Sequence, residues 1–335
     1  LDALWPHFEW VEEQMSVSRW PQGVGPASRM IKKGADALGW SSQEVTRFWK
    51  YKNKKDRQGR RQSMTETLVP RALEAGTRLH PHTKVERLVI RRGLTVAAEA
   101  TRTDAQGQKH PVRIRFQSVF VCGGAVQTAL LLRRSGIKDR IGESLCMHPM
   151  IRIAARFPET FNDPSWGVPV QQIDQFKPEV TLGCSHSSLP HIALWLTGKG
   201  VDKKALLAEW DKMAVFYVAA VGHGRGRIRH LPLVHEPLIR FPMLDADMAR
   251  MGEGLYNLGQ AVFAAGATEI YSPIEGQEPF RSADAMQPLC AGIPHGKVNI
   301  STIHLFSSVP MGEAPLCPVD SWGHLRGYRN IHIND

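Results

Sequence analysis

The sequence lacks every cysteine pattern that is typical of a disulfide framework or of a cysteine-rich zinc site. Its five cysteines are scattered, their number is odd, and no Cys-x-x-Cys pair occurs. These absences exclude a small secreted fold held together by disulfides, and they exclude a zinc ribbon. Because this cysteine usage fits a reducing compartment, we predict a cytoplasmic protein without a metal site.

Long hydrophobic runs and internal repeats are also absent. No apolar stretch approaches the roughly 20 residues that a membrane-spanning helix needs, and no repeat indicates a solenoid or a propeller. The 335 residues include 42% hydrophobic and 22% charged side chains, which are typical values for a globular protein. Because this length exceeds the usual size of one domain, we predict two packed regions and no membrane span.

A complete Gly-x-Gly-x-x-Gly fingerprint for a dinucleotide is missing. The nearest approach, Gly23-Val-Gly25, follows Arg-Trp-Pro-Gln, and its third glycine is absent. The fingerprint needs a strand before its glycines and a helix after them. Since Arg-Trp-Pro-Gln is not a strand, we reject this stretch as a phosphate-binding turn.

The net charge of +10 is unevenly spread along the chain. Residues 50–61, KYKNKKDRQGRR, hold seven basic side chains and one aspartate, which is a local charge of +6. The segment could meet phosphate or an acidic partner, but we prefer an exposed loop with solvated charges. No zinc finger, RNA-recognition motif or helix-turn-helix accompanies it. We therefore expect no nucleic-acid partner and keep a basic nucleic-acid-binding protein as a remote alternative.

The most informative stretch is residues 116–149. Its residues 118–122, SVFVC, form a short apolar run that is typical of a strand covered on both faces. Gly123 and Gly124 end this run, and an apolar helix follows. Bare backbone N–H groups at such a helix N-terminus can bind an anionic group of a nucleotide. A Gly-Gly pair can also serve only to turn the chain, so the local pattern leaves both interpretations open.

The flanking patterns predict a mixed fold. A small antiparallel meander is predicted at about 84–115, from the runs at residues 84–91, 94–101 and 112–115. Residues 150–230 hold several more strand-like runs, and residues 192–197 are one of them. Together these runs predict a mainly antiparallel sheet. An aspartate at position 245 or 247 caps a long helix with an apolar stripe that extends through Ala265.

Three blocks, in the right order, resemble the glucose–methanol–choline (GMC) oxidoreductases, a family of flavin-dependent alcohol oxidases and dehydrogenases. Residues 123–137, GGAVQTALLLRRSGI, resemble the second signature of the family, with Ala129 in place of the usual proline. Residues 141–149, IGESLCMHP, resemble the block Val-Gly-x-Asn-Leu-x-x-His-Pro. His304 and the following Met-Gly have the spacing of the active-site block His-x-x-Gly-Thr-x-x-Met-Gly, with serines in place of its Gly and Thr.

This resemblance implies FAD as the cofactor and an alcohol as the substrate, with hydride passing from the CH–OH carbon to flavin N5. His304 is then expected to act as the base or to stabilise the alkoxide, a role that suits an imidazole. The cofactor-binding residues that the resemblance implies are Gly123, Gly124, Ala125, Val85 through its backbone to adenine, Asn334 and Asp335.

The same resemblance implies an α/β (α+β) fold: an incomplete Rossmann-like FAD-binding domain and a substrate domain with a mainly antiparallel sheet backed by helices. The expected boundaries are residues 1–149 for part of the FAD-binding domain, 150–291 for the substrate-binding domain, and 292–335 for a return to the FAD domain with its active-site histidine. The N-terminal Gly-x-Gly-x-x-Gly strand and the C-terminal catalytic segment of the family are not found. We therefore expect an internal fragment of a short bacterial member. The full parent protein is expected to be the oxidoreductase, whereas this chain alone is expected to bind FAD weakly or not at all.

Several alternatives stay open. The chain could be a non-catalytic fragment or a split subunit that binds no flavin. The substrate could be a sterol, a long-chain alcohol, a choline-like compound or a sugar alcohol, because no motif fixes the side chains that face it. The electron acceptor, oxygen or a carrier, is equally open.

Overall fold

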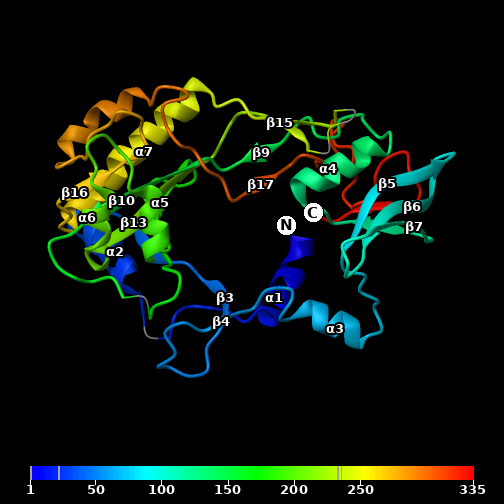
Figure 1. The fold of residues 1–335 in the computed structure, drawn as a ribbon, viewed down its shortest axis with the longest axis horizontal. Coiled ribbons are helices and arrows are strands. Elements are labelled where there is room, and N and C mark those ends of the chain that lie inside the picture. Colours follow the sequence, from blue (N-terminus) through cyan, green and yellow to red (C-terminus); the bar gives the residue numbers. More distant parts are fainter. Residues whose placement is uncertain (1, 22, 164, 232–233, 235) are drawn as a thin grey trace. The chain divides into compact units, whose positions relative to one another are not determined.

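The computed structural model describes residues 2–21, 23–163, 165–231, 234 and 236–335 (Figure 1). Contacts between Cα atoms divide the chain into two compact units. Unit 1 comprises Leu1–Arg78, Pro149–Val221 and Asp245–Ser301, and unit 2 comprises Leu79–His148, Gly222–Leu244 and Thr302–Asp335.

Unit 1 is built on a six-stranded sheet in which every neighbouring pair is antiparallel. This confirms the antiparallel sheet that the runs after residue 150 predict. In spatial order the strands are β16 (Glu269–Tyr271), β10 (Met150–Arg156), β13 (Met213–Ala220), β12 (Val180–Cys184), β11 (Gln171–Ile173) and β2 (Ser42–Glu44). The last strand was not predicted, and it comes from a part of the chain more than a hundred residues before the others.

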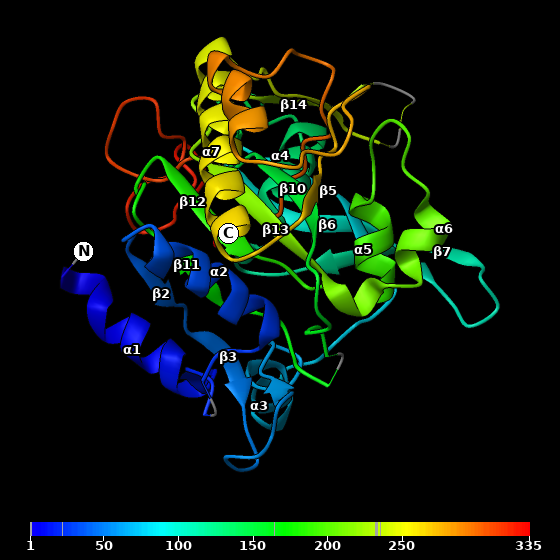
Figure 2. The same cartoon turned by 90° about the vertical axis from the view of Figure 1, so that its left-hand side faces the viewer.

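Two helices, α2 (Pro26–Ala37) and α7 (Asp245–Ala264), lie over one face of this sheet (Figure 2). Helix α7 begins with acidic residues in its first turn and buries a stripe that includes Met251 and Leu255, as its sequence predicts. The two helix backbones meet at Gly34, where an added Cβ would lie 1.8 Å from the carbonyl oxygen of Ala261. Only glycine allows this close approach.

The opposite face of the sheet carries α5 (Leu189–Trp195) and α6 (Lys203–Leu207). Ile192 and Leu196 pack there against Ala154 and Val215 in a buried cluster. The prediction of a strand over residues 192–197 is therefore wrong. Its apolar run was too short to show a period, whereas a proline near position N1 favours the start of a helix.

The remaining elements of unit 1 are short: η1 (Asp2–Leu4), α1 (Trp5–Gln14), β1 (Val17–Ser18), β3 (Arg47–Lys50), β4 (Arg60–Arg61), α3 (Leu68–Glu74), η2 (Trp210–Lys212) and η3 (Asp284–Ala291). Strands β3 and β4 pair, so the basic segment 50–61 is a hairpin. Its single acid, Asp56, accepts backbone N–H bonds from Lys52, Gln58 and Gly59. The carboxylate thus organises the loop, and most of the basic side chains around it are exposed.

Unit 2 contains the predicted meander and the predicted strand–turn–helix. The meander is formed by β5 (Thr83–Arg91), β6 (Leu94–Thr103) and β7 (Lys109–Arg115). Strand β8 (Val119–Val121) leads into α4 (Gly124–Arg134), and β18 (Ile331–Ile333) pairs with β8 in parallel. Two small antiparallel pairs complete the unit: β9 (Cys146–Met147) with β17 (Leu305–Phe306), and β14 (Arg227–Arg229) with β15 (Leu238–Arg240).

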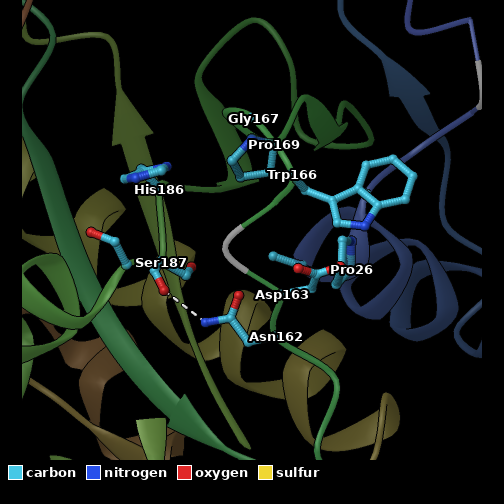
Figure 3. A pocket seen from close by; sticks show the side chains of 11 residues that line it. Pro26, Asn162, Asp163, Trp166, Gly167, Pro169, His186 and Ser187 are labelled. Carbon is cyan, nitrogen blue, oxygen red and sulfur yellow. Dashed lines mark hydrogen bonds between the residues drawn. The ribbon is translucent and has the colours of Figure 1, made fainter. Parts of the chain in front are cut away.

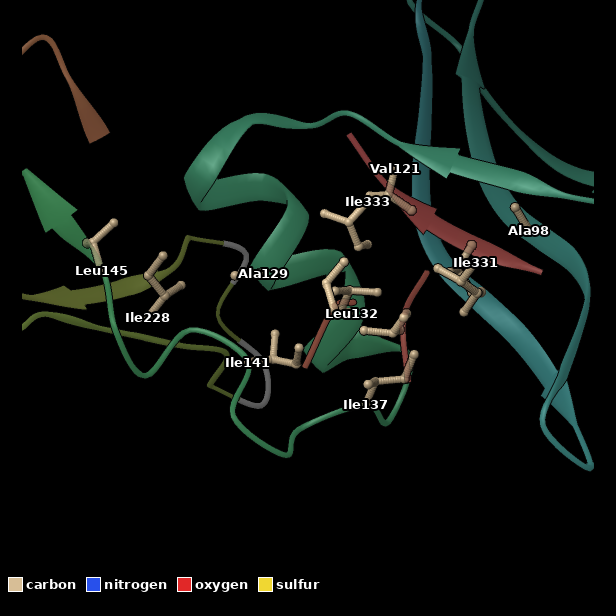
Figure 4. Packing of buried hydrophobic residues seen from close by; sticks show 13 residues of the cluster. Ala98, Val121, Ala129, Leu132, Ile137, Ile141, Leu145, Ile228, Ile331 and Ile333 are labelled. Atoms are coloured by element: carbon tan, nitrogen blue, oxygen red, sulfur yellow. The ribbon is translucent and has the colours of Figure 1, made fainter. Parts of the chain in front are cut away.

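A single apolar core holds these segments of unit 2 together (Figure 4). Leu132 from α4 and Ile141 from the following loop are fully buried there, beside Ile331 and Ile333 of β18. Burial of each such side chain contributes about 1.5–3 kcal/mol. The core thus fixes the C-terminal strand against the central strand–turn–helix, although the two lie far apart in sequence.

The observed units differ from the expected boundaries. Residues 1–78 were expected in the FAD-binding part, but they group with unit 1 because α2 packs on α7 and β2 pairs with β11. Residues 222–244 were expected in the substrate domain, but they group with unit 2 because β14 packs on α4. The return to unit 2 begins at Thr302 rather than at residue 292.

Within the described residues, no helix is both long enough and apolar enough to span a membrane.

Candidate functional site

The turn between β8 and α4 favours glycine at both of its positions. Gly124 has a φ of +77°, which side chains rarely allow. A Cβ on Gly123 would lie 3.1 Å from the backbone nitrogen of Thr128. The N–H of Gly123 instead donates to Thr128 Oγ1 at 2.9 Å. The turn therefore brings exposed backbone to the N-terminus of an eleven-residue helix.

Asn334 and Asp335 lie at this same turn. Because β18 runs parallel to β8, both strands end at the same edge. The N–H of Asn334 donates to the carbonyl of Val121 at 3.1 Å. The N–H of Gly124 donates to Asp335 Oδ1 at 2.8 Å, and the Thr128 hydroxyl donates to the other carboxylate oxygen. An anionic oxygen is thus already held at the start of α4, where the helix dipole favours it.

A cavity of about 490 Å³ adjoins the turn. Val85 and Gly123 both line it, together with Leu88, Ala98, Phe116, Val119, Phe120, Val121, Cys122, Gln127, Leu131 and others. Within the described part of the chain, β5 is an edge strand, so its outward backbone groups near Val85 pair with no neighbouring strand there. A β-bulge between Val85 and Arg87 also re-aims this strand. Apolar walls beside free backbone groups can hold a planar heterocycle such as adenine.

Ala125 is placed differently from the two glycines. Its side chain packs against the apolar core of unit 2, and its carbonyl oxygen accepts a hydrogen bond from the hydroxyl of Ser308. Since Ser308 follows His304 by four positions, this bond links the segment of the predicted catalytic histidine to the first turn of α4.

His304 lies next to a second histidine that the sequence interpretation did not single out. The Nδ1 atoms of His148 and His304 are 3.1 Å apart, and the ring planes are nearly perpendicular. The pairing of β9 with β17 brings the two together, and the N–H of His148 also donates to the carbonyl of His304 at 3.3 Å. The only sequence signal for His148 was its place in the His-Pro block at residues 141–149.

The electrostatics of this pair are asymmetric. Burial lowers the pKa of His148, and the neighbouring His304 lowers it further. His304 is exposed, whereas His148 is half-buried. His148 therefore resists protonation, because burial and a neighbouring positive charge both disfavour its charged form.

A second pocket lies in unit 1, among Pro26, Asn162, Trp166, His186 and Ser187 (Figure 3). The amide of Asn162 donates to the carbonyl oxygen of Ser187 at 2.6 Å and so ties two loops together. The pocket measures about 60 Å³, far below the several hundred Å³ of typical ligand sites. We place the functional site in unit 2 because the glycine turn and the His148–His304 pair both lie there.

No group of three or more His, Cys, Asp or Glu side chains is placed to hold a metal ion among the residues that the structure describes.

Comparison with known proteins identifies the family. A family model described as GMC oxidoreductase matches residues 2–150. The chain is 34% identical over 342 residues to a GMC-type oxidoreductase of Sinorhizobium fredii, covering 100% of this chain and 68% of the relative. It is 28% identical over 279 residues to a GMC-type oxidoreductase of Mycobacterium tuberculosis, and this match covers 80% of this chain and 42% of the relative.

Solved structures agree on the fold. Pyridoxine 4-oxidase from Mesorbium loti superposes with a TM-score of 0.65 at 16% identity, over 93% of this chain and 64% of that one. An FAD-dependent oxidoreductase from Chaetomium thermophilum superposes with a TM-score of 0.61 at 12% identity, over 94% of this chain and 68% of that one. The chain thus spans between 42% and 68% of the lengths of these relatives. It belongs to the GMC oxidoreductases, a family of FAD-dependent oxidoreductases with a Rossmann-like cofactor-binding fold.

Proposed function

We propose that the chain forms part of an FAD-dependent oxidoreductase that acts on the CH–OH group of an alcohol. The observation that carries this proposal is the meeting, within unit 2, of the glycine turn and the His148–His304 pair. The hydrogen bond from Ser308 to the carbonyl of Ala125 joins the two. A turn suited to a nucleotide and a histidine pair on one apolar core are what a flavin-dependent alcohol oxidation needs.

The residues present fit FAD. At the N-terminus of α4, the N–H of Gly123 donates to Thr128 Oγ1 and the N–H of Gly124 donates to Asp335 Oδ1. A bound pyrophosphate would take the place of these acceptors. This end of α4 suits the negative charge of a pyrophosphate. Val85, on the edge of the meander, would offer its backbone to adenine, and Asn334 would stand close to the same turn. Bound there, FAD would supply the acceptor for the hydride of the alcohol carbon.

His304 would act on the hydroxyl group of the alcohol. Its Nδ1 faces His148, so its Nε2 is the atom left to take the hydroxyl proton. Once protonated, His304 would donate from Nδ1 to the neutral His148 and would stabilise the developing carbonyl compound through Nε2–H. His148 contacts His304, so it would act as a positioning residue for the base.

Unit 1 would be the substrate-binding part. Its six-stranded sheet is covered on one face by α2 and α7 and only partly covered by α5 and α6 on the other. A sheet face that is partly open and carries polar side chains is suited to bind a small molecule. This domain assignment extends the expectation for residues 150–291 to the whole of unit 1.

The proposal is tested with the purified protein at its full length and with added FAD. Binding is followed by quenching of flavin fluorescence, and alcohols of several classes are then added without oxygen. We expect loss of the oxidised flavin band with at least one alcohol, and a rate at least about a hundredfold lower in His304→Ala. Bound flavin that no alcohol reduces would contradict the alcohol assignment. Failure to bind flavin would favour the alternative of a non-catalytic piece.

A further inference from the structure

A polar row crosses the sheet of unit 1. Arg152 on β10 lies directly opposite Tyr217 on β13, Tyr217 lies opposite Gly183 on β12, and Gly183 lies opposite Gln172 on β11. Directly opposed residues in antiparallel strands share one face of the sheet. Ala154 and Val215, two positions along β10 and β13, lie on this same face beneath α5. The row thus adjoins the covered part of the face.

Tyr217 is held in a defined orientation. Its ring lies across Gly183, where an added Cβ would be 2.5 Å from the phenolic oxygen. This oxygen accepts a hydrogen bond from Gln172 Nε2 at 2.7 Å. Burial raises the pKa of Tyr217 to about 12, so the hydroxyl keeps its proton at neutral pH. Among the described residues, no acceptor for that proton is found.

Arg152 is half-buried and carries a charge that no carboxylate neutralises in the part of the chain that the structure describes. Its Nη1 donates to Ser301 Oγ at 2.6 Å, and its Cζ lies 5.3 Å from the ring centroid of Trp195. Arg156, four positions along the same strand, instead pairs with Glu209 and Glu269. A half-buried guanidinium with one hydroxyl acceptor leaves most of its five N–H groups available for a ligand.

We propose that Arg152 and Tyr217 form a recognition site for a carboxylate carried by the alcohol substrate. The planar fork of a guanidinium matches the two oxygens of a carboxylate, and the Tyr217 hydroxyl adds a third donor. A single positive charge matches a carboxylate better than a doubly charged phosphate. The role in substrate recognition rests on the proposed function, whereas the binding itself does not need flavin.

The test compares two probes of nearly the same shape, one with a carboxylate and one with a neutral amide in its place. The purified chain, without flavin, is titrated with 4-(hydroxymethyl)benzoate and with 4-(hydroxymethyl)benzamide, and binding is followed by tryptophan fluorescence and calorimetry. We expect the carboxylate to bind roughly ten- to a hundredfold more tightly than the amide. Inorganic phosphate should compete poorly. Equal binding of the two probes, no saturable binding of either, or effective competition by phosphate would overturn the proposal.

Variants then locate the site. Arg152→Gln should abolish the preference for the carboxylate, Arg152→Lys should restore part of it, and Tyr217→Phe should weaken carboxylate binding several-fold while its ring still covers Gly183. Arg29→Gln is the matched control, since Arg29 also stacks on a tryptophan, Trp166, at 5.7 Å but lies outside the row.

The inference is wrong if Arg152→Gln, shown to be folded by circular dichroism, keeps the preference for the carboxylate over the amide. If Arg152→Gln does not fold, Tyr217→Phe decides, because unchanged carboxylate binding in that variant is also contrary to the inference. If carboxylate binding is found but flavin binding is not, the proposed function fails and this inference stands.

Discussion

The Nδ1 atoms of His148 and His304 lie 3.1 Å apart although 156 residues separate the two in sequence. At this distance one nitrogen must donate and the other must accept, because two lone pairs or two N–H groups would repel each other. The more buried His148 is the better neutral acceptor, so His304 is expected to carry its proton on Nδ1. Its Nε2 then keeps a free lone pair, and protonation there requires no change of tautomer.

Removing the acceptor should therefore change the tautomer of His304. In His148→Phe, we expect His304 to shift toward the Nε2–H form that an unconstrained neutral imidazole prefers. His148→Asn, whose amide oxygen can stand near the former Nδ1, should largely preserve the Nδ1–H form. The measurement is the nitrogen NMR spectrum of histidine-labelled protein above pH 7. An identical His304 tautomer in wild type and His148→Phe would show that the pair does not control it.

The same pair should make unit 2 sensitive to mild acid. Because the pKa of His148 is lowered in the folded chain, mainly by burial and then by His304, the unfolded chain takes up that proton more readily. The resulting stability is fully present above the unfolded pKa of about 6.5, and it is lost as the pH falls through the folded pKa. We expect the melting temperature to fall less between about pH 7.5 and about pH 5.5 in His148→Asn than in wild type. A steeper fall in the variant would contradict the direction of the shift.

The glycine turn permits a matched pair of substitutions. Gly124 and Gly136 have φ values of +77° and +87°, and nothing lies within 4 Å of an added Cβ on either. Each substitution to Ala should cost about 1 kcal/mol of stability, because alanine tolerates this backbone poorly. Only Gly124→Ala should also weaken FAD binding, by roughly tenfold or more, because only Gly124 stands at the N-terminal end of α4. Flavin-fluorescence titration beside thermal melts separates the two effects, and equal FAD affinities would contradict the assignment.

Local patterns explain which parts of the fold the sequence predicts. Strand β8, its glycine turn and α4 are contiguous in sequence. Each has a local signal, namely an apolar run, a glycine pair and an apolar helical stripe, and the structure confirms all three. Strand β2, SQE, is short and polar, and it belongs to the six-stranded sheet only because β11 pairs with it. No local signal marks such an edge strand. Helix α5 was mistaken for a strand for the related reason that its apolar run is very short.

The candidate site shows the same limit. The resemblance supplied Gly123, Gly124, Asn334, Asp335 and Val85, and the structure brings them to one turn and its adjoining cavity. Their roles toward FAD stay predictions. His148 was missed as a partner of His304 because the strands that join them are two residues each. A pairing that depends on the tertiary fold leaves no periodic trace in the sequence.

Glu143 joins two elements of unit 2 through charge. Its two carboxylate oxygens accept from Nη1 and Nη2 of Arg229 at 2.6 and 2.7 Å, and Arg133 of α4 lies 3.4 Å away. The bond from Arg229 is the main reason that the pKa of Glu143 is lowered. Burial, and then the charge of Arg229, lower the pKa of Arg133. The Glu143 carboxylate lies beside both arginines and so offsets the repulsion between their charges.

Glu143→Gln should therefore cost about 1 kcal/mol near pH 7, a value reduced for the partial exposure of the carboxylate. A carboxyl whose folded pKa is lowered stabilises above its unfolded pKa of about 4.3, and this contribution is lost as the pH falls through the folded value. The difference between wild type and variant should thus shrink below about pH 4, when followed by urea denaturation. Glu99→Gln is the control, since Glu99 pairs with the exposed Arg87 and with no other basic side chain that the structure describes. It should cost no more than about 0.5 kcal/mol. Equal losses in the two variants would show that the link between α4 and β14 contributes nothing beyond an ordinary surface ion pair.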